Sequence, residues 1–104
     1  MIIRINPDLQ KASSLKQTAM ITYQRLSEID KEKYPSNTLT DYYEIIRKLM
    51  ESLNSIEGIK FSGEGAQYEV IEHTCKSYGI KSLYREFLQA MRDYRNRILM
   101  RVLL

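Results

Sequence analysis

The sequence contains one cysteine, one histidine and no apolar run long enough to span a bilayer. The lone Cys75 cannot form an intramolecular disulfide, which fits a reducing compartment, and we expect it to be a small helix-packing residue. A membrane-spanning helix needs roughly 20 apolar residues, and the apolar start at residues 1–3 is too short for a signal-peptide core. These shortages predict a cytoplasmic protein without membrane contact.

The residue clusters of common metal and nucleophilic sites are also missing. His73 has no second histidine and no cysteine cluster at zinc-ligand spacing, so we expect no metal site and no cofactor. No local sequence suggests a Ser-His-Asp or Cys-His arrangement. Gly63-Glu64-Gly65 lacks the Gly-Lys-Ser/Thr ending and the preceding strand of a phosphate loop. We therefore expect His73 to be a half-buried helix residue and the glycines to form a linker and helix start.

Helical periodicity dominates what remains. The length of 104 residues predicts a single domain over residues 1–104. Strand patterns are absent, apart from a short extended piece at residues 2–5. Four segments have apolar residues at helical spacing, namely residues 6–33, 38–57, 64–78 and 82 to near the end. Their short connections predict an all-α fold, an antiparallel up-down four-helix bundle.

Local signals set the expected helix boundaries. Asn6 is expected to cap the first helix, with Pro7 in its first turn, and Thr38-x-x-Asp41 resembles a capping box for the second. Gly58 and Gly79 are expected to end the second and third helices. The apolar stripe expected on the second helix comprises Tyr42, Ile46, Leu49, Leu53 and Ile56.

Charge is distributed unevenly although the net charge is only +3. The middle of the chain is acidic, whereas residues 82–104 carry five arginines against two acids. This asymmetry allows the last helix to pair with the middle helices inside the fold. It also provides a basic face of the kind that binds phosphate. The composition does not separate these two consequences.

Arg95 falls within the apolar stripe of the last helix, where a guanidinium is rarely buried unless it is paired. That stripe is expected to comprise Tyr84, Phe87, Leu88, Met91, Ile98 and Val102. Arg92 and Asn96 flank Arg95, and Arg85 lies on the same edge, a little under two turns earlier. Arginine grips phosphate or carboxylate with a rigid fork. Arg95 therefore either pairs with an inward acid, such as Glu64, Glu69 or Glu72, or faces a cleft between subunits.

The segment Arg92-Asp93-Tyr94-Arg95-Asn96-Arg97-Ile98 resembles the signature of the HEPN superfamily. Arg95 and Asn96 match its arginine and the polar neighbour, and Gly63-Glu64-Gly65-Ala66 is similar to archaeal members. The resemblance implies an all-α bundle that forms dimers. Many members pair with minimal nucleotidyltransferases in toxin–antitoxin modules, and many are metal-independent ribonucleases.

The sequence departs from the family at the motif histidine. With four or six intervening residues, that histidine would fall at Met100 or Val102, neither of which transfers protons. Whether the protein is an enzyme stays open, with binding favoured over catalysis. The resemblance therefore implies a catalytically degenerate protein that binds nucleotide, RNA or a nucleotidyltransferase through Arg92, Arg95, Asn96 and Arg85.

Three further expectations accompany this interpretation. The apolar surplus of residues 98–104 predicts a homodimer through the last helix, or a helix that continues beyond Leu104. One alternative is an active ribonuclease that uses His73 as a relocated base, or a fragment whose active-site tail is missing. The other is a structural bundle without a nucleic-acid role, in which Arg95 forms an internal salt bridge.

Overall fold

The computed structural model describes the backbone of residues 1–103 and the side chains of residues 1–101. The protein is mostly helical, which confirms the expected all-α class, and it adds one small two-stranded sheet. The elements in chain order are β1 (Ile2–Arg4), α1 (Leu9–Ser27), α2 (Pro35–Glu57), β2 (Ile59–Phe61), α3 (Ala66–Ser77) and α4 (Ser82–Leu103). In the described part of the chain, no helix is long and apolar enough to cross a membrane.

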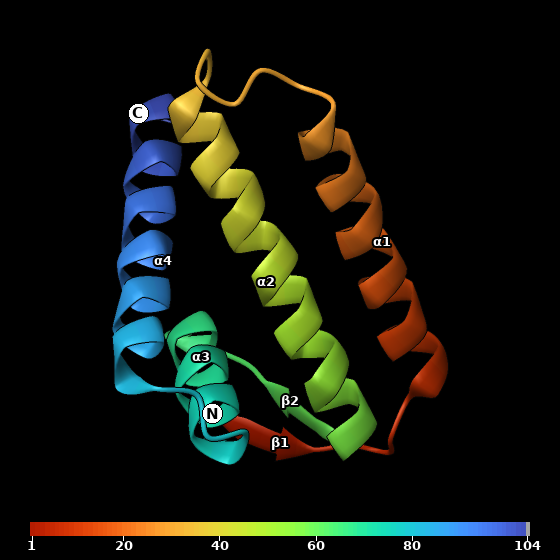
Figure 1. Ribbon diagram of the computed structural model, residues 1–104. Helices are drawn as coiled ribbons and strands as arrows, with labels where there is room; N and C mark the ends of the chain where they lie inside the picture. The colour runs from red at the N-terminus through yellow and green to blue at the C-terminus, as the bar shows by residue number, and fades with distance from the viewer. Residues whose placement is uncertain (104) are drawn as a thin grey trace.

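Helices α1 and α2 form an antiparallel pair (Figure 1). The cap of α1 is Asp8, whose side chain accepts a hydrogen bond from the Lys11 amide, so the expected cap at Asn6 is wrong by two residues. Ala12, Ala19 and Leu26 are buried at seven-residue spacing along α1. Small side chains permit a close approach, and the Ser52 hydroxyl of α2 donates to the Ala12 carbonyl at 2.7 Å.

Helix α2 begins three residues before its expected capping box. Pro35 occupies the first turn, where its missing N–H is not needed, and Thr38 is buried inside the helix. The Thr38 hydroxyl donates to the Tyr34 carbonyl at 2.9 Å, so Thr38 is not the cap. The predicted C-terminal stop is confirmed at Gly58, which has a φ of 77°.

Helix α2 is the central element and is buried on more than one side. One core cluster gathers Ala19 and Leu26 of α1 against Ile45. A second cluster packs Tyr43 and Met50 of α2 against α3 and α4, through Val70, Ile71, Cys75, Leu88 and Met91. Because α2 serves two clusters, the single stripe expected from its sequence is only partly buried, and Ile56 is exposed.

The two strands join the chain start to the end of α2. Ile2 pairs with Phe61 and Arg4 with Ile59 in an antiparallel ladder. The extended piece expected near residues 2–5 is confirmed, whereas β2 was not predicted, because three residues are too few to establish a strand period. The segment Ile59–Phe61 packs against the helices, since Ile59 is buried and Phe61 packs on the second core cluster.

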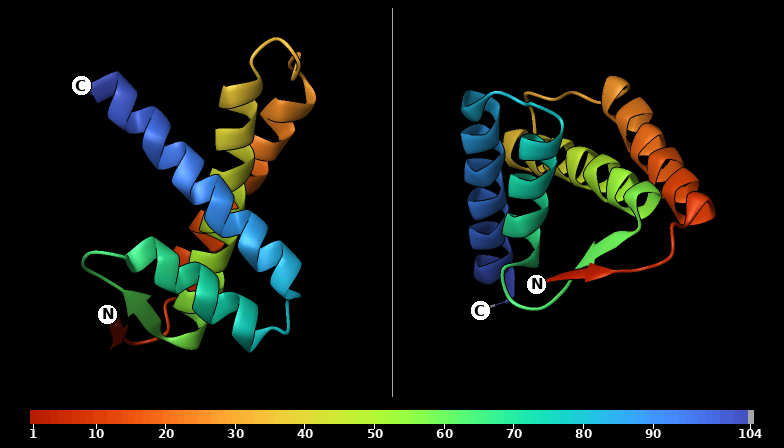
Figure 2. Two further views of the ribbon diagram at one scale, coloured as in Figure 1. Left: turned by 90° about the vertical axis from the view of Figure 1, so that its left-hand side faces the viewer. Right: turned by 90° about the horizontal axis from the view of Figure 1, so that it is seen from below.

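Helices α3 and α4 pack on α2 away from α1, and α4 crosses α2 at a wide angle (Figure 2). Within the described residues, α1 contacts neither α3 nor α4. Leu88 and Met91 are buried as expected, but Tyr84 and Phe87 are each 57% exposed, so their assignment to the core stripe is wrong. Ile98 is half-buried, and the side chain of Val102 lies outside the described residues. Helix α4 begins at Ser82.

Candidate functional site

Arg95 lies between α4 and the helices α2 and α3 of its own chain. Its side chain is only 13% exposed, and its Nη1 lies 3.3 Å from Glu44 Oε1. Its Nη2 donates to Gln67 Oε1 at the start of α3. The guanidinium also lies over the Tyr43 ring, 5.2 Å from the ring centroid. Arg95 therefore connects three helices through one planar group.

Tyr43 completes this arrangement from beneath the guanidinium. Its hydroxyl donates to Gln67 Oε1 at 3.1 Å, so both Tyr43 and Arg95 hold the same amide oxygen. Burial raises the pKa of the Tyr43 phenol above 10.0, although the nearby Arg95 cation acts in the opposite direction. Tyr43 therefore stays protonated at neutral pH and acts as a hydrogen-bond donor. Gln67 is fixed in place as a result.

The prediction that Arg95 pairs with Glu64, Glu69 or Glu72 is wrong. Glu69 instead pairs with the amino terminus of Met1 at 2.8 Å, Glu72 pairs with Arg85 at 2.7 Å, and Glu64 is exposed. The partner is Glu44, which the sequence did not predict. Glu44 also pairs with Arg47, and Arg47 in turn pairs with Glu51.

Arg92 and Asn96 lie on one rim of a separate open hollow of about 300 Å³. Gly63, Gly65, Ala66, Gln67 and Tyr68 line the rest of it. Arg92 Nε donates to Gln89 Oε1 at 2.9 Å, its Nη2 lies 2.8 Å from Asp93, and its guanidinium lies 5.6 Å from the Tyr68 ring centroid. The structure thus brings together Arg92 and Asn96, two of the predicted site residues. The side chain of Asn96 is exposed.

The floor of this hollow is the start of α3. Gly65 caps the helix with a φ of 79°, a conformation that glycine adopts without steric cost, and this confirms the expected linker and helix start. The amides of Gln67 and Tyr68 belong to the first turn, where N–H groups have no intrahelical acceptor. The partial positive charge of a helix N-terminus therefore adds to the charge of Arg92.

Arg85, the remaining predicted site residue, lies elsewhere. It donates to Glu72 and lines a different hollow with Cys75, Lys76 and Ile80. Arg85 and Arg92 are two helical turns apart, which is about 10 Å along the axis. The structure therefore does not place Arg85 in the hollow with Arg92 and Asn96.

His73 is also remote from that hollow. Its Nε2 lies 3.0 Å from Glu57 Oε2, and its ring lies 5.5 Å from the Phe61 ring centroid. The Tyr78 hydroxyl donates to the other Glu57 oxygen at 2.9 Å. His73 is six residues beyond Gln67, or about 9 Å along α3. Its side chain is 26% exposed, which confirms the expected half-buried position.

Residue clusters suited to metal binding do not occur among the described residues, where no group of three or more His, Cys, Asp or Glu side chains converges. Comparison of the chain with protein-family models, with curated proteins and with solved structures gave no match.

Proposed function

We propose that this protein binds the phosphate groups of RNA or of a nucleotide without cleaving them, as a catalytically degenerate HEPN-like protein. The observation that carries this proposal is the hollow in which Arg92 and Asn96 meet the start of α3. An arginine fork and first-turn amides are both suited to a phosphate oxygen.

Each residue of the hollow has a distinct role in this proposal. Arg92 supplies charge and directional donors, and the exposed Asn96 amide supplies a second contact. The exposed Tyr68 ring, which Arg92 already approaches, offers a face for a base. Arg95 acts as a positioning residue, because it holds Gln67 rather than reaching the open hollow itself.

Binding is favoured over cleavage because of the side chains that line this hollow. Cleavage of RNA at the 2′-hydroxyl needs one group to accept a proton and one to donate a proton near neutral pH. The residues that line the hollow are Gly63, Gly65, Ala66, Gln67, Tyr68, Arg92 and Asn96, and this set contains no histidine, cysteine or carboxylate to accept the proton. His73 is engaged with Glu57 outside the hollow, so the ribonuclease alternative lacks a base in reach.

The HEPN-like bundle and its partners are part of the same proposal. The order of four helices, with Arg95-Asn96 on the last one, supports a HEPN-like arrangement. Leu99 and Met100 are 45% and 56% exposed near the end of α4, which supports a homodimer through that helix. A minimal nucleotidyltransferase of a toxin–antitoxin module is the protein partner that the resemblance implies.

A second candidate is a structural helical protein without a nucleic-acid role. The specific observation that favours it is the internal pairing of Arg95 with Glu44 and Gln67, because the most diagnostic arginine already has partners in its own chain. In that case the arginines of α4 stabilise the fold through ion pairs within the chain and do not bind a ligand.

Fluorescence anisotropy with a labelled single-stranded RNA, at 50 and 200 mM salt, separates these candidates. The proposal predicts binding at low salt, and Arg92→Ala should weaken it about tenfold and reduce the salt slope by about one. Asn96→Ala should weaken it by a smaller factor. Arg25→Ala removes the same charge from an exposed position on α1 and is the matched control.

Two results would reject phosphate binding at this hollow. One is the lack of measurable affinity at low salt, which favours the structural candidate. The other is an equal effect of Arg92→Ala and Arg25→Ala on the affinity. That result would mean that binding depends on net charge alone and not on this hollow. RNA cleavage that disappears in His73→Ala would instead support the ribonuclease alternative.

A further inference from the structure

Another hollow, of about 240 Å³, lies between the start of α2 and the C-terminal half of α4. Its lining residues are Ser36 of α2 and, from α4, Tyr94, Arg97, Ile98 and Arg101. The four residues of α4 recur at intervals of three and four, so they share one face of the helix. None of the lining residues belongs to the hollow at Arg92 and Asn96, so the two hollows are separate.

Arg97 and Arg101 bring two positive charges to the hollow at Ser36. Residues four apart on one helix have Cβ atoms about 5–6 Å from each other, and both side chains are exposed. Among the residues whose side chains the structure describes, neither guanidinium forms an ion pair with a carboxylate. The other three arginines of α4 each pair with an acid, namely Arg85, Arg92 and Arg95. Since no acid lines the hollow, its positive charge is left for a ligand.

Ser36 and Tyr94 add a pair of hydroxyl groups to the same hollow. Ser36 Oγ and Tyr94 Oη lie 2.7 Å apart and form a hydrogen bond between α2 and α4. Each hydroxyl carries one hydrogen, and the bond between them uses only one of the two. The hydroxyl that accepts this bond can therefore donate its own hydrogen to an acceptor in the hollow.

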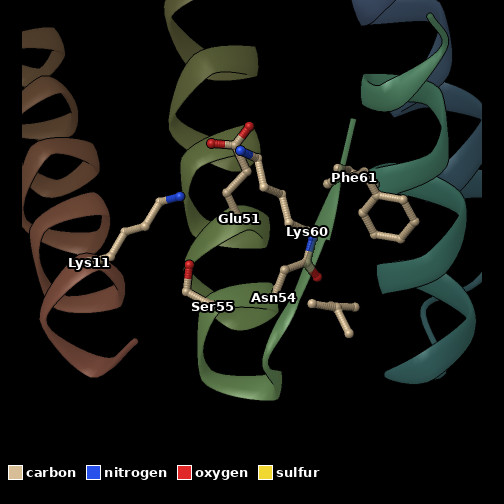
Figure 3. Close-up of a pocket in the computed structure, with 8 residues that line it drawn as sticks. Lys11, Glu51, Asn54, Ser55, Lys60 and Phe61 are labelled. Atoms are coloured by element: carbon tan, nitrogen blue, oxygen red, sulfur yellow. The ribbon is translucent and has the colours of Figure 1, made fainter. Parts of the chain in front are cut away.

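A cavity elsewhere in the protein shows the opposite balance of charge. It lies among α1, α2, β2 and α3, and Figure 3 shows Lys11 and Lys60 extending toward Glu51. The Glu51 carboxylate lies between the two ammonium groups and would repel an anion. The hollow at Ser36 brings cations and a hydroxyl donor together without a lining carboxylate, so it is the site that suits an anion.

We propose that the hollow at Ser36 binds a phosphate group. The guanidinium groups of Arg97 and Arg101 donate to its oxygens, and the free hydroxyl hydrogen of the Ser36–Tyr94 pair supplies a further donor. The same chemistry fits inorganic phosphate and a phosphodiester of an RNA backbone. This site is independent of the proposed function at Arg92, because the two hollows share no residue. Either can fail without the other.

A titration of the ¹⁵N-labelled full chain with inorganic phosphate, followed by NMR, tests the proposal. Saturable shifts are expected at the Nε–H groups of Arg97 and Arg101 and at the backbone amide of Ser36. Sodium chloride at the same ionic strength is the matched control. It should give no saturable shift at these groups, because chloride lacks the separate oxygens that two guanidinium groups can share.

Variants at the two exposed arginines assign the phosphate site without disturbing the core. Arg97→Gln combined with Arg101→Gln should weaken phosphate binding about fivefold or more, which is the range for two exposed charge contacts. Glutamine has nearly the helix propensity of arginine, so α4 should be retained. Arg4→Gln combined with Arg25→Gln makes the same charge change at exposed positions outside the hollow and should leave the affinity unchanged.

A second titration, with a short single-stranded RNA, identifies the source of the phosphate group. Shifts at Arg97 and Arg101 at lower concentrations of RNA than of inorganic phosphate would assign the site to an RNA backbone. Shifts at these groups with inorganic phosphate but not with RNA would assign it to free phosphate. If RNA leaves the Arg92 signal unchanged while phosphate shifts Arg97, the proposed function fails and the site at Ser36 stands.

Two outcomes would overturn the proposal. One is the absence of saturable shifts at Arg97 and Arg101 with both inorganic phosphate and RNA, because no site is then filled. The other is an equal loss of phosphate affinity in the Arg97–Arg101 double variant and in the Arg4–Arg25 double variant. Phosphate would then respond to the net charge of the protein and not to this hollow.

Discussion

Arg95 of α4 and Glu44 of α2 form an ion pair inside one chain, with Nη1 and Oε1 3.3 Å apart. The pair connects the basic last helix to the central helix. At this point the charge asymmetry along the sequence provides an ion pair inside the fold. Arg85 and Glu72 repeat the pattern between α4 and α3. The basic face left for phosphate is therefore smaller than the arginine count indicates.

The Arg95–Glu44 pair should contribute measurably to stability because it is mostly buried. We expect Arg95→Met and Glu44→Gln each to lower the free energy of unfolding by about 1–3 kcal/mol. A double-mutant cycle from urea denaturation should give a coupling energy of about 1 kcal/mol. The cycle is needed because Glu44 also pairs with Arg47. A coupling energy near zero would mean that Arg95 is held by Gln67 and Tyr43 alone.

Gly58 should tolerate no side chain. Its φ of 77° disfavours other residues, and an added Cβ would lie 2.8 Å from the Ile5 carbonyl oxygen. Gly58→Ala is therefore expected to cost about 2 kcal/mol or more in thermal or urea unfolding. Gly79→Ala is the matched control, because Gly79 has a φ of 65° with no atom near the added Cβ. Its cost should be only about 1 kcal/mol. Equal costs would show that the contact with Ile5 is unimportant.

Glu72 should make stability depend on acidic pH. Burial opposes the effect, but hydrogen bonds from Gln89 and Arg85 lower the pKa of its carboxyl below 4.5. A lowered pKa in the folded state means that Glu72 stabilises the fold at neutral pH and loses this contribution as the pH falls below 4.5. Glu72→Gln should therefore cost up to about 1 kcal/mol at pH 7.

That difference in unfolding free energy between wild type and Glu72→Gln should shrink when urea denaturation is repeated below pH 4.5. Arg85→Gln removes one of the three hydrogen-bond donors to Glu72 and should show the same trend. A difference that stays constant with pH would contradict the role of Glu72.

The proposed dimer makes a separate prediction at the end of α4. Light scattering at two protein concentrations should give a dimer mass, and Leu99→Asp should reduce it to the monomer, because a charge would enter an apolar contact. Leu9→Asp is the control, since Leu9 is 69% exposed on α1. A dimer that persists in Leu99→Asp but is lost in Ile21→Asp would place the interface on α1, where Ile21 is 51% exposed.

The helix boundaries show which features of the fold can be predicted from local sequence. The glycines at the ends of α2 and α3 were predicted from sequence, because a helix end that needs a positive φ favours glycine whatever packs around it. Asn6 and Thr38 were wrong as caps, although both are good cap residues, because Asp8 and Pro35 provide starts that suit the packing of α1 and α2. Capping propensity identifies the residues at which a helix could begin, and tertiary contacts decide at which of them it does begin.

The residues of the candidate site also fall into two groups, those that the sequence predicted and those that it did not. Arg92, Arg95 and Asn96 were found in the sequence because charged and polar groups at helical spacing share an edge of one helix. The sequence did not reveal that Gln67 and Tyr68 complete the hollow, or that Glu44 takes Arg95, because these contacts join α4 to helices distant in the chain.

Local sequence is enough to predict four helical segments, the glycines that end two of them and a basic last helix, because these follow from backbone preferences and side-chain periodicity within a few turns. The packing of the helices, and not their local sequence, buries α2 on two sides, leaves Phe87 exposed and pairs Arg95 within its own chain. Such outcomes depend on which helix faces cover one another. Burial is a property of the assembled set of helices, and no single helix encodes it.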